Sequence, residues 1–252
     1  MRVFAVSDVH VDYQDNKKWL LGLSSVDYLD DVVILAGDLT DDLQLLEECF
    51  NDISAKFSKV LFVPGNHELW VSRDRRFNSI EKYQQISELA ISTGVSMTPT
   101  HFGTLSIVPL FSWYDFSFAT PDKKLMDTWM DFRACVWPDN KQPSEITDYF
   151  LDKNKVNLSV RNETVISFSH FLPRIDLMPI YIPPAYHYLY PALGSDLLEE
   201  QIRVLKPNIH VYGHSHVNRK LTLGGVQYIN NAFGYPSEDS ITVKELICIY
   251  EN

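Results

Sequence analysis

Side chains that bind metal ions occur in five short groups along the chain, and each group directly follows a run of apolar residues. The groups are Asp8-Val9-His10, Gly37-Asp38, Gly65-Asn66-His67-Glu68, the single His170, and Gly213-His214-Ser215-His216. Carboxylate, imidazole and amide groups gathered in one place can bind two metal ions, and such pairs of ions cleave phosphoric esters. No cysteine is among them, which argues against a structural zinc site with thiolate ligands.

The apolar runs are expected to be buried β-strands that position these groups. They span residues 3–6, 32–36, 60–64, 165–168 and 209–212. Open α/β folds build their sites at the carboxyl ends of such strands. If the extended backbone continues past the strand end, residues two apart point the same way, so Asp8 and His10 can hold one cation, and His214 and His216 repeat that spacing. Glycines 37, 65 and 213 are expected to let the backbone turn tightly beside the metal ions.

The five motifs resemble those of the calcineurin-like metallophosphoesterases, which carry DxH, GDxx, GNH(D/E), a separate His and GHxH in this order. The resemblance runs from Met1 to about Tyr235. It is closest to uncharacterised plant, protist and bacterial members, through the stretches 65–70, 107–114 and 169–174. It implies an α/β fold, a four-layer αββα sandwich in which two mixed β-sheets lie face to face between outer helices.

The resemblance also implies a ligand set and a mechanism. One metal ion is expected to be bound by Asp8, His10, Asp38 and His216, and the other by Asp38, Asn66, His170 and His214, with Asp38 as the bridge. This mixed set suits Mn, Fe, Zn or Ni better than Mg or Ca, and leaves the identity of the metal open. A metal-bridging hydroxide is expected to attack a phosphomonoester or phosphodiester in line. His67 is expected to be the general acid, because an imidazole can hold a proton near neutral pH.

The groups that hold phosphate in two known subfamilies have no counterpart here. Serine/threonine protein phosphatases carry arginines where this chain has Asp42 and Pro64. Purple acid phosphatases carry a metal-binding tyrosine where it has Asp41. Other groups must therefore hold the phosphate. For the arginines at 73–76 the alternative is a solvated loop before a helix. The candidates are Arg73, Arg174 and His187.

Composition favours one soluble enzyme domain spanning residues 1–252. With 45% hydrophobic residues the chain can bury a substantial core, and no apolar run is long enough to cross a membrane. The formal charge of -11 argues against nucleic acid as a partner. Three cysteines, few and odd in number, and a core strand at the very start of the chain predict a cytoplasmic protein. The expected partner is a small phosphoester, and the oligomeric state is left open.

Further patterns predict the elements around the motifs. Helices are expected after Asp41-Asp42, after an Asn78/Glu81 capping box, and over 196–205. A hairpin is expected over 219–229 and a last strand over 241–250. Segments 113–160 and 171–191, rich in aromatic residues and prolines respectively, are expected to be loops that form walls or a cap over the metal ions. Alternatively, their aromatic residues only cover the core.

Two other functions remain open at this point. A nuclease on the same scaffold is disfavoured by the acidic charge, and a non-catalytic interaction module that kept only the fold is disfavoured by the intact ligand motifs. Metal analysis together with hydrolysis of model monoesters and diesters would separate these classes.

Overall fold

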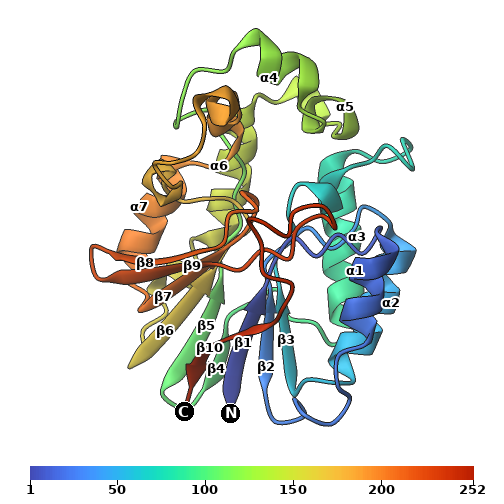
Figure 1. Ribbon diagram of the computed structural model, residues 1–252, viewed down its shortest axis with the longest axis vertical. Helices are drawn as coiled ribbons and strands as arrows, with labels where there is room; N and C mark the ends of the chain where they lie inside the picture. Colours follow the sequence, from blue (N-terminus) through green and yellow to red (C-terminus); the bar gives the residue numbers. More distant parts are fainter.

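Two β-sheets lie face to face in the computed structural model, which describes residues 1–252 (Figure 1). The first sheet has the strand order β10-β1-β2-β3, in which β1, β2 and β3 are parallel and β10 is antiparallel to β1. The bounds are Arg2–Val6 for β1, Val32–Leu35 for β2, Lys59–Phe62 for β3 and Ile247–Glu251 for β10. Both ends of the chain therefore meet in this sheet.

The second sheet has the order β4-β5-β6-β7-β9-β8. Its four central strands are parallel, and the edge strands β4 and β8 are antiparallel to their neighbours. The bounds are Thr100–Phe102 for β4, Leu105–Pro109 for β5, Thr164–Phe168 for β6, Ile209–Tyr212 for β7, Arg219–Leu223 for β8 and Val226–Asn230 for β9. The central strands are buried on both faces and correspondingly apolar, as parallel strands between layers must be.

Helices cover the outer face of each sheet (Figure 1). The first sheet is covered by α1 (Gln14–Leu21), α2 (Leu43–Ser54) and α3 (Ser79–Ser92), and the second by α6 (Pro143–Asn154) and α7 (Asp196–Leu205). Two short helices, α4 (Lys123–Thr128) and α5 (Asp131–Ala134), lie at the end toward which the parallel strands point. The predicted four-layer αββα sandwich with two mixed sheets is confirmed. No helix has the length and apolar character needed to cross a membrane.

Local sequence signals account for the start of these helices. The side chain of Asp42 accepts hydrogen bonds from the backbone N–H groups of Gln44 and Leu45, and so caps α2. Asn78 and Glu81 form the predicted capping box at the start of α3. Helix α7 has the predicted bounds, and the predicted hairpin is β8–β9. These elements were predictable because their signals lie within a few residues.

Two segments differ from their expectation. Segment 113–160, expected to be loops, contains α4, α5 and α6, and α6 buries Ile146 and Phe150 in the core. The predicted last strand begins at Ile247, not at 241, because Lys244 donates to the carbonyls of Phe233 and Tyr235 and holds the preceding residues in a turn. Segment 171–191, by contrast, matches its expectation as a loop: it has only the 3-10 helices Ile175–Leu177 and Pro184–Ala192, because its prolines exclude a regular helix.

Candidate metal centre and active site

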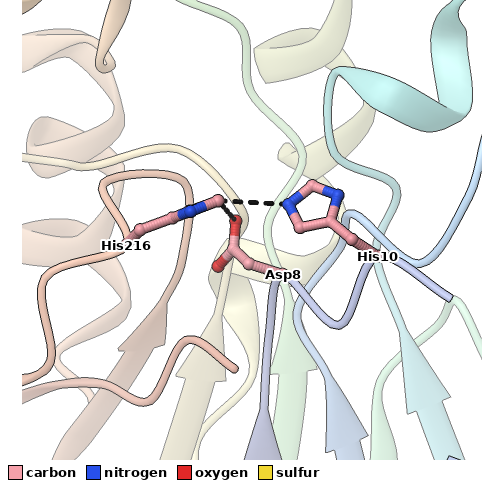
Figure 2. Close-up of side chains that lie close together, drawn as sticks. All are labelled: Asp8, His10 and His216. Carbon is pink, nitrogen blue, oxygen red and sulfur yellow. Dashed lines mark hydrogen bonds and ion pairs between the residues drawn. The ribbon is translucent and has the colours of Figure 1, made fainter. Parts of the chain in front are cut away.

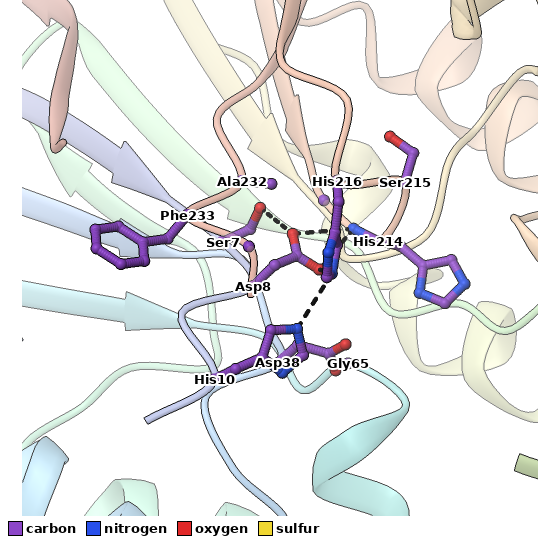
Figure 3. A network of polar contacts seen from close by, with 12 residues as sticks. Ser7, Asp8, His10, Asp38, Gly65, His214, Ser215, His216, Ala232 and Phe233 are labelled. Carbon is purple, nitrogen blue, oxygen red and sulfur yellow. Dashed lines mark hydrogen bonds and ion pairs between the residues drawn. The ribbon is translucent and has the colours of Figure 1, made fainter. Parts of the chain in front are cut away.

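The five motifs lie at the carboxyl ends of β1, β2, β3, β6 and β7, so the two sheets bring them together. Figure 3 shows residues of four of these motifs side by side, among them Asp8, Asp38 and His216. Backbone hydrogen bonds join the motif loops: Asp8 N–H donates to the carbonyl of Gly37, and Gly213 N–H donates to that of His170. Beside them, Ser7 exchanges backbone hydrogen bonds with Asn231 and Phe233 and so links the first sheet to the second. The site is therefore built across the seam between the sheets.

Asp8, His10 and His216 form the first group of converging side chains (Figure 2). His10 Nε2 lies 3.1 Å from His216 Nε2, and His216 Nε2 lies 3.3 Å from Asp8 Oδ1. Asp8 and His10 are almost completely buried, and the side chain of His216 is 12% exposed. Their possible ligand atoms all lie within 4.8 Å of one another.

Asp38, Asn66, His170 and His214 form the second group. His170 Nε2 is the common point, at 3.1 Å from His214 Nδ1, 3.2 Å from Asn66 Oδ1 and 3.4 Å from Asp38 Oδ2. Asp38 also belongs with His10 and His67 to a third overlapping group. Asp38 therefore lies between the first and second groups, as expected for a residue that the family resemblance makes the bridging ligand.

The spacing within both groups fits bound metal ions. With metal–nitrogen bonds of about 2.1 Å, ligand atoms around a tetrahedral ion lie about 3.4 Å apart. The distances of 3.1–3.4 Å in each group agree with this value. The remaining imidazole nitrogens are held by other groups: His170 Nδ1 lies 2.9 Å from the carbonyl oxygen of Ala36, and His214 Nε2 lies 3.0 Å from that of Ala192. Such contacts orient histidines that bind metals.

The backbone at the strand ends is left-handed, not extended. Five of the predicted ligands have positive φ angles: Asp8 (54°), His10 (46°), Asp38 (57°), His214 (67°) and His216 (52°). The premise that an extended backbone continues past the strand is therefore wrong, although the side chains do converge. Residues other than glycine rarely adopt this conformation, and those that do cluster at functional sites.

The glycines serve close approach as much as turning. Gly37 has a φ of 87°, as expected for a tight turn. Gly65 and Gly213 have ordinary φ angles, but a Cβ atom at Gly213 would lie 2.7 Å from Asp8 Oδ2, and one at Gly65 would lie 2.7 Å from His170 Nε2. Any larger residue at these two positions would enter the space of the metal-binding side chains.

Charge is balanced inside the site. Burial alone would raise the pKa of Asp38, but His170 and His67 outweigh it and hold that pKa well below its usual value. Burial alone would lower the pKa of His170, but the carboxylates of Asp38 and Asp8 outweigh it and raise that pKa to about 9. In the same way Asp8 and Glu238 raise the pKa of His216 to about 10. A cation that enters must displace these protons.

Glu68 fixes the loops that carry Asp38 and Asn66, a role the sequence did not reveal. Its fully buried carboxylate accepts hydrogen bonds from the backbone N–H groups of Asp38 (2.9 Å), Leu39 (2.5 Å), Thr40 (3.1 Å) and Gly65 (2.7 Å). These donors come from the ends of β2 and β3. Glu68 therefore holds two motif loops in register with each other.

The C-terminal segment adds two residues that sequence reasoning missed. Glu238 Oε2 lies 2.7 Å from His216 Nδ1 and fixes that ring. The ring of Tyr235 stacks on His10, with centroids 4.5 Å apart. Neither residue belongs to a motif, and both follow the last motif by about twenty residues in the chain.

His67 lies at the border between the buried groups and solvent. Its Nε2 atom is 3.7 Å from Asp38 Oδ2, and its side chain is 16% exposed. The ring stacks on Trp70 with centroids 3.8 Å apart and meets His10 edge-on at 4.6 Å. It can therefore face a substrate while remaining beside the second group.

An open cleft of about 490 Å³ leads to these residues. It is lined by His10, Asp12, Tyr13, Asp41, His67, Trp70, Ser72, Arg73, Met130 and Tyr235. Arg73 is the one arginine or lysine in its wall, and its guanidinium pairs with Asp41 at 2.7 Å and with Asp12 at 3.0 Å. The structure thus brings Arg73, of the three phosphate-binding candidates, to the cleft.

The other two candidates are held elsewhere. The guanidinium of Arg174 pairs with Asp176 at 2.7 Å and with Glu199 at 3.1 Å, and Arg174 does not line the cleft. His187 is exposed, lies 3.0 Å through Nε2 from the carbonyl oxygen of Ile182, and stacks on Tyr190. The structure gives both residues local partners in place of the predicted contact with substrate.

The family model described as calcineurin-like phosphoesterase matches residues 1–218, which contain all five motifs. The chain belongs to this family. Its members are metal-dependent phosphoesterases, so the chain hydrolyses a phosphomonoester or a phosphodiester. The predicted family and enzyme class are confirmed. The groups described above are residues that could bind the metal ions.

Individual relatives were found as well. The chain is 26% identical over 259 residues to the [acyl-carrier-protein] phosphodiesterase PptH of Mycobacterium tuberculosis. This match covers 94% of this chain and 78% of the relative. The crystal structure of the phosphopantetheinyl hydrolase PptH from the same organism matches with a TM-score of 0.84 at 20% identity, over 100% of this chain and 96% of the other. A purple acid phosphatase from yellow lupin seeds matches with a TM-score of 0.51 at 14% identity, over 91% of this chain and 43% of the other. The structural matches support the fold.

Proposed function

We propose that this phosphoesterase binds two transition-metal ions and hydrolyses a phosphodiester with His67 as the general acid. The observation that carries the proposal is the arrangement of two groups of ligand atoms on either side of Asp38, with His67 between them and an open cleft. Asp8, His10, Asp38 and His216 would hold one ion, and Asp38, Asn66, His170 and His214 the other. Mn, Fe, Zn and Ni all suit this set.

Each part of the site has a separate task. When bound, the two cations supply Lewis-acid chemistry: they lower the pKa of a water molecule and neutralise charge on the phosphoryl group. His67 would donate its proton to the oxygen of the leaving group, and stacking on Trp70 keeps its ring turned toward the cleft. Arg73 would contact a non-bridging phosphate oxygen, since it is the cation in the cleft wall.

The similarity to the acyl-carrier-protein phosphodiesterase supports a phosphodiester of the phosphopantetheine type as the substrate, because the match extends over most of both chains. A nuclease is disfavoured by Asp12 and Asp41 in the cleft wall and by the net charge of -11. A non-catalytic module would have no need for seven converging ligand side chains. The three cysteines are unpaired, which supports our proposal of a cytoplasmic location.

Metal analysis and two kinds of ester test the proposal. The purified protein should contain two transition-metal ions per chain and should hydrolyse a carrier protein loaded with phosphopantetheine faster than phosphomonoesters. A protein without metal, or one inactive on every phosphoric ester with metal supplied, would refute the site. Faster turnover of monoesters would refute only the diester preference.

Replacing His67 separates acid catalysis from metal binding. His67→Ala should keep both metals and lose about 10²–10⁴-fold in rate on alkyl esters, the usual size of general acid catalysis. The loss should shrink for nitrophenyl esters, whose leaving group departs with little protonation. His101→Ala, an exposed strand residue, is the control and should match the wild type. An equal loss on both esters would remove His67 as the acid, and loss of metal would make it a ligand.

A further inference from the structure

A buried carboxylate from the short helix α5 lies directly behind the second group. Asp131 is 2% exposed, and its hydrogen-bond partners are neutral N–H groups. Oδ1 accepts from Asn66 Nδ2 at 2.9 Å and from Trp70 Nε1 at 2.7 Å, and Oδ2 accepts from Trp129 Nε1 at 2.8 Å. Burying a carboxylate without a cationic partner costs free energy. A carboxylate held only by three neutral donors therefore points to a role other than stabilising the fold.

Each of these donors also contacts a residue of the site. The amide oxygen of Asn66 lies 3.2 Å from His170 Nε2, on the side where a metal ion is expected. The indole of Trp70 stacks on His67 at 3.8 Å, and that of Trp129 meets His214 edge-on at 5.7 Å. One carboxylate thus contacts the proposed ligand Asn66 directly and also contacts the indoles that pack on the proposed acid and on the proposed ligand His214.

We infer that Asp131 is a positioning residue that turns the amide oxygen of Asn66 toward the metal and holds Trp70 against His67. An amide has a donor end and an acceptor end of nearly the same shape, so only its partners decide which end faces the metal. An acceptor fixed behind Nδ2 leaves Oδ1 as the end that faces inward. The inference rests on the proposed function, because it assigns Asn66 and His67 the roles given there.

Helix α5 is attached to the rest of the protein without Asp131. Val71 N–H donates to the carbonyl of Ala134 at 2.8 Å, and Ser79 N–H donates to that of Val136 at 2.7 Å. A variant at Asp131 should therefore keep this segment in place, and its effects should appear at the metal.

Equilibrium dialysis against Mn²⁺ tests the inference. Asp131→Ala should bind one of its two Mn²⁺ ions about 10–100-fold more weakly, the usual cost of removing a partner of a metal ligand, while the other ion binds as in the wild type. Asp31→Asn is the control, because Asp31 is a buried carboxylate just before β2, at the opposite end of that strand from Asp38. It should keep both ions even if it lowers stability.

A second pair of variants keeps the test decisive if Asp131→Ala does not fold. In Asp131→Asn the amide oxygen can still accept from Asn66 and Trp70, but the amide NH₂ then faces the N–H group of Trp129. This opposition should weaken the binding of one Mn²⁺ ion in Asp131→Asn. The double variant with Trp129→Phe removes the opposing donor and should recover most of the lost affinity, measured against Trp129→Phe alone because Trp129 also contacts His214. Two ions at wild-type affinity in Asp131→Ala, or no recovery in the double variant, would overturn the inference. A wild-type protein that binds none of Mn²⁺, Fe²⁺, Zn²⁺ and Ni²⁺ would instead refute the proposed function.

Discussion

Replacing Glu68 by glutamine should destabilise the protein strongly, although the change is nearly isosteric. Oε1 of Glu68 accepts from the N–H groups of Leu39 and Thr40, and Oε2 accepts from those of Asp38 and Gly65. A glutamine has one oxygen in place of two, so two of these backbone donors would face its NH₂ group.

The magnitude follows from the number of donors left without a partner. A buried group without its hydrogen bond costs about 1–3 kcal/mol. Two such groups give about 2–6 kcal/mol, because Glu68 is completely buried and water does not reach its partners. For a domain of this size each kcal/mol lowers Tm by about 2–4 °C, so Glu68→Gln should lower Tm by at least about 4 °C.

Differential scanning calorimetry on the metal-free protein measures this effect without contributions from bound metal. Glu47→Gln, on the exposed side of α2, makes the same chemical change without those four donors and should leave Tm within about 1 °C of the wild type. If Glu68→Gln behaved like this control, the carboxylate would not hold the two loops together, and our account of how Asp38 is fixed would be refuted.

Two further predictions concern the metal ions. Asp38→Asn should abolish activity and lose at least one metal ion per chain, because an amide offers one neutral acceptor where a bridge needs two charged oxygens. Two metal ions per chain at full turnover in this variant would exclude Asp38 as the bridge. Chelation should lower Tm by about 11–22 °C, since a metal present at 100 times its Kd contributes about 2.7 kcal/mol at each of the two sites and each kcal/mol is worth about 2–4 °C. A thermal shift assay with and without EDTA measures this, and an unchanged Tm would mean that the folded chain does not bind metal more tightly than the unfolded one.

Much of the fold was predictable because its signals are local. The apolar runs before Asp8 and Asp38 gave β1 and β2, and the caps at Asp42 and Asn78 gave the starts of α2 and α3. The convergence of the motifs followed from their common place at strand ends, together with the family resemblance. Of the helices missed in segment 113–160, α4 and α5 are only six and four residues long, too short to show a period. Helix α6 has twelve residues and a capping box formed by Gln142 and Glu145, a local signal that sequence reasoning missed.

The supports of the site could not be predicted in this way. Asp131 lies 65 residues from Asn66 along the chain, and Glu238 lies 22 residues from His216. Nothing in the residues around either carboxylate distinguishes it from a helix or turn residue on the surface. Only the fold brings such pairs together, so their roles become visible once the buried donors around each carboxylate are known.

The left-handed backbone of the predicted ligands shows how the fold and the metal depend on each other. A residue other than glycine in this conformation costs about 1–3 kcal/mol, and five of the seven predicted ligands adopt it. Glycine would relieve this strain but would remove the side chains that must converge. At Asp38 this cost is offset by the hydrogen bond from its N–H group to Glu68. At Asp8 and His214 it is offset by the hydrogen bonds from the N–H group of His214 to both oxygens of Asp8 (Figure 3). We therefore expect the backbone to be largely set before metal binds, so that the ions meet side chains already in place.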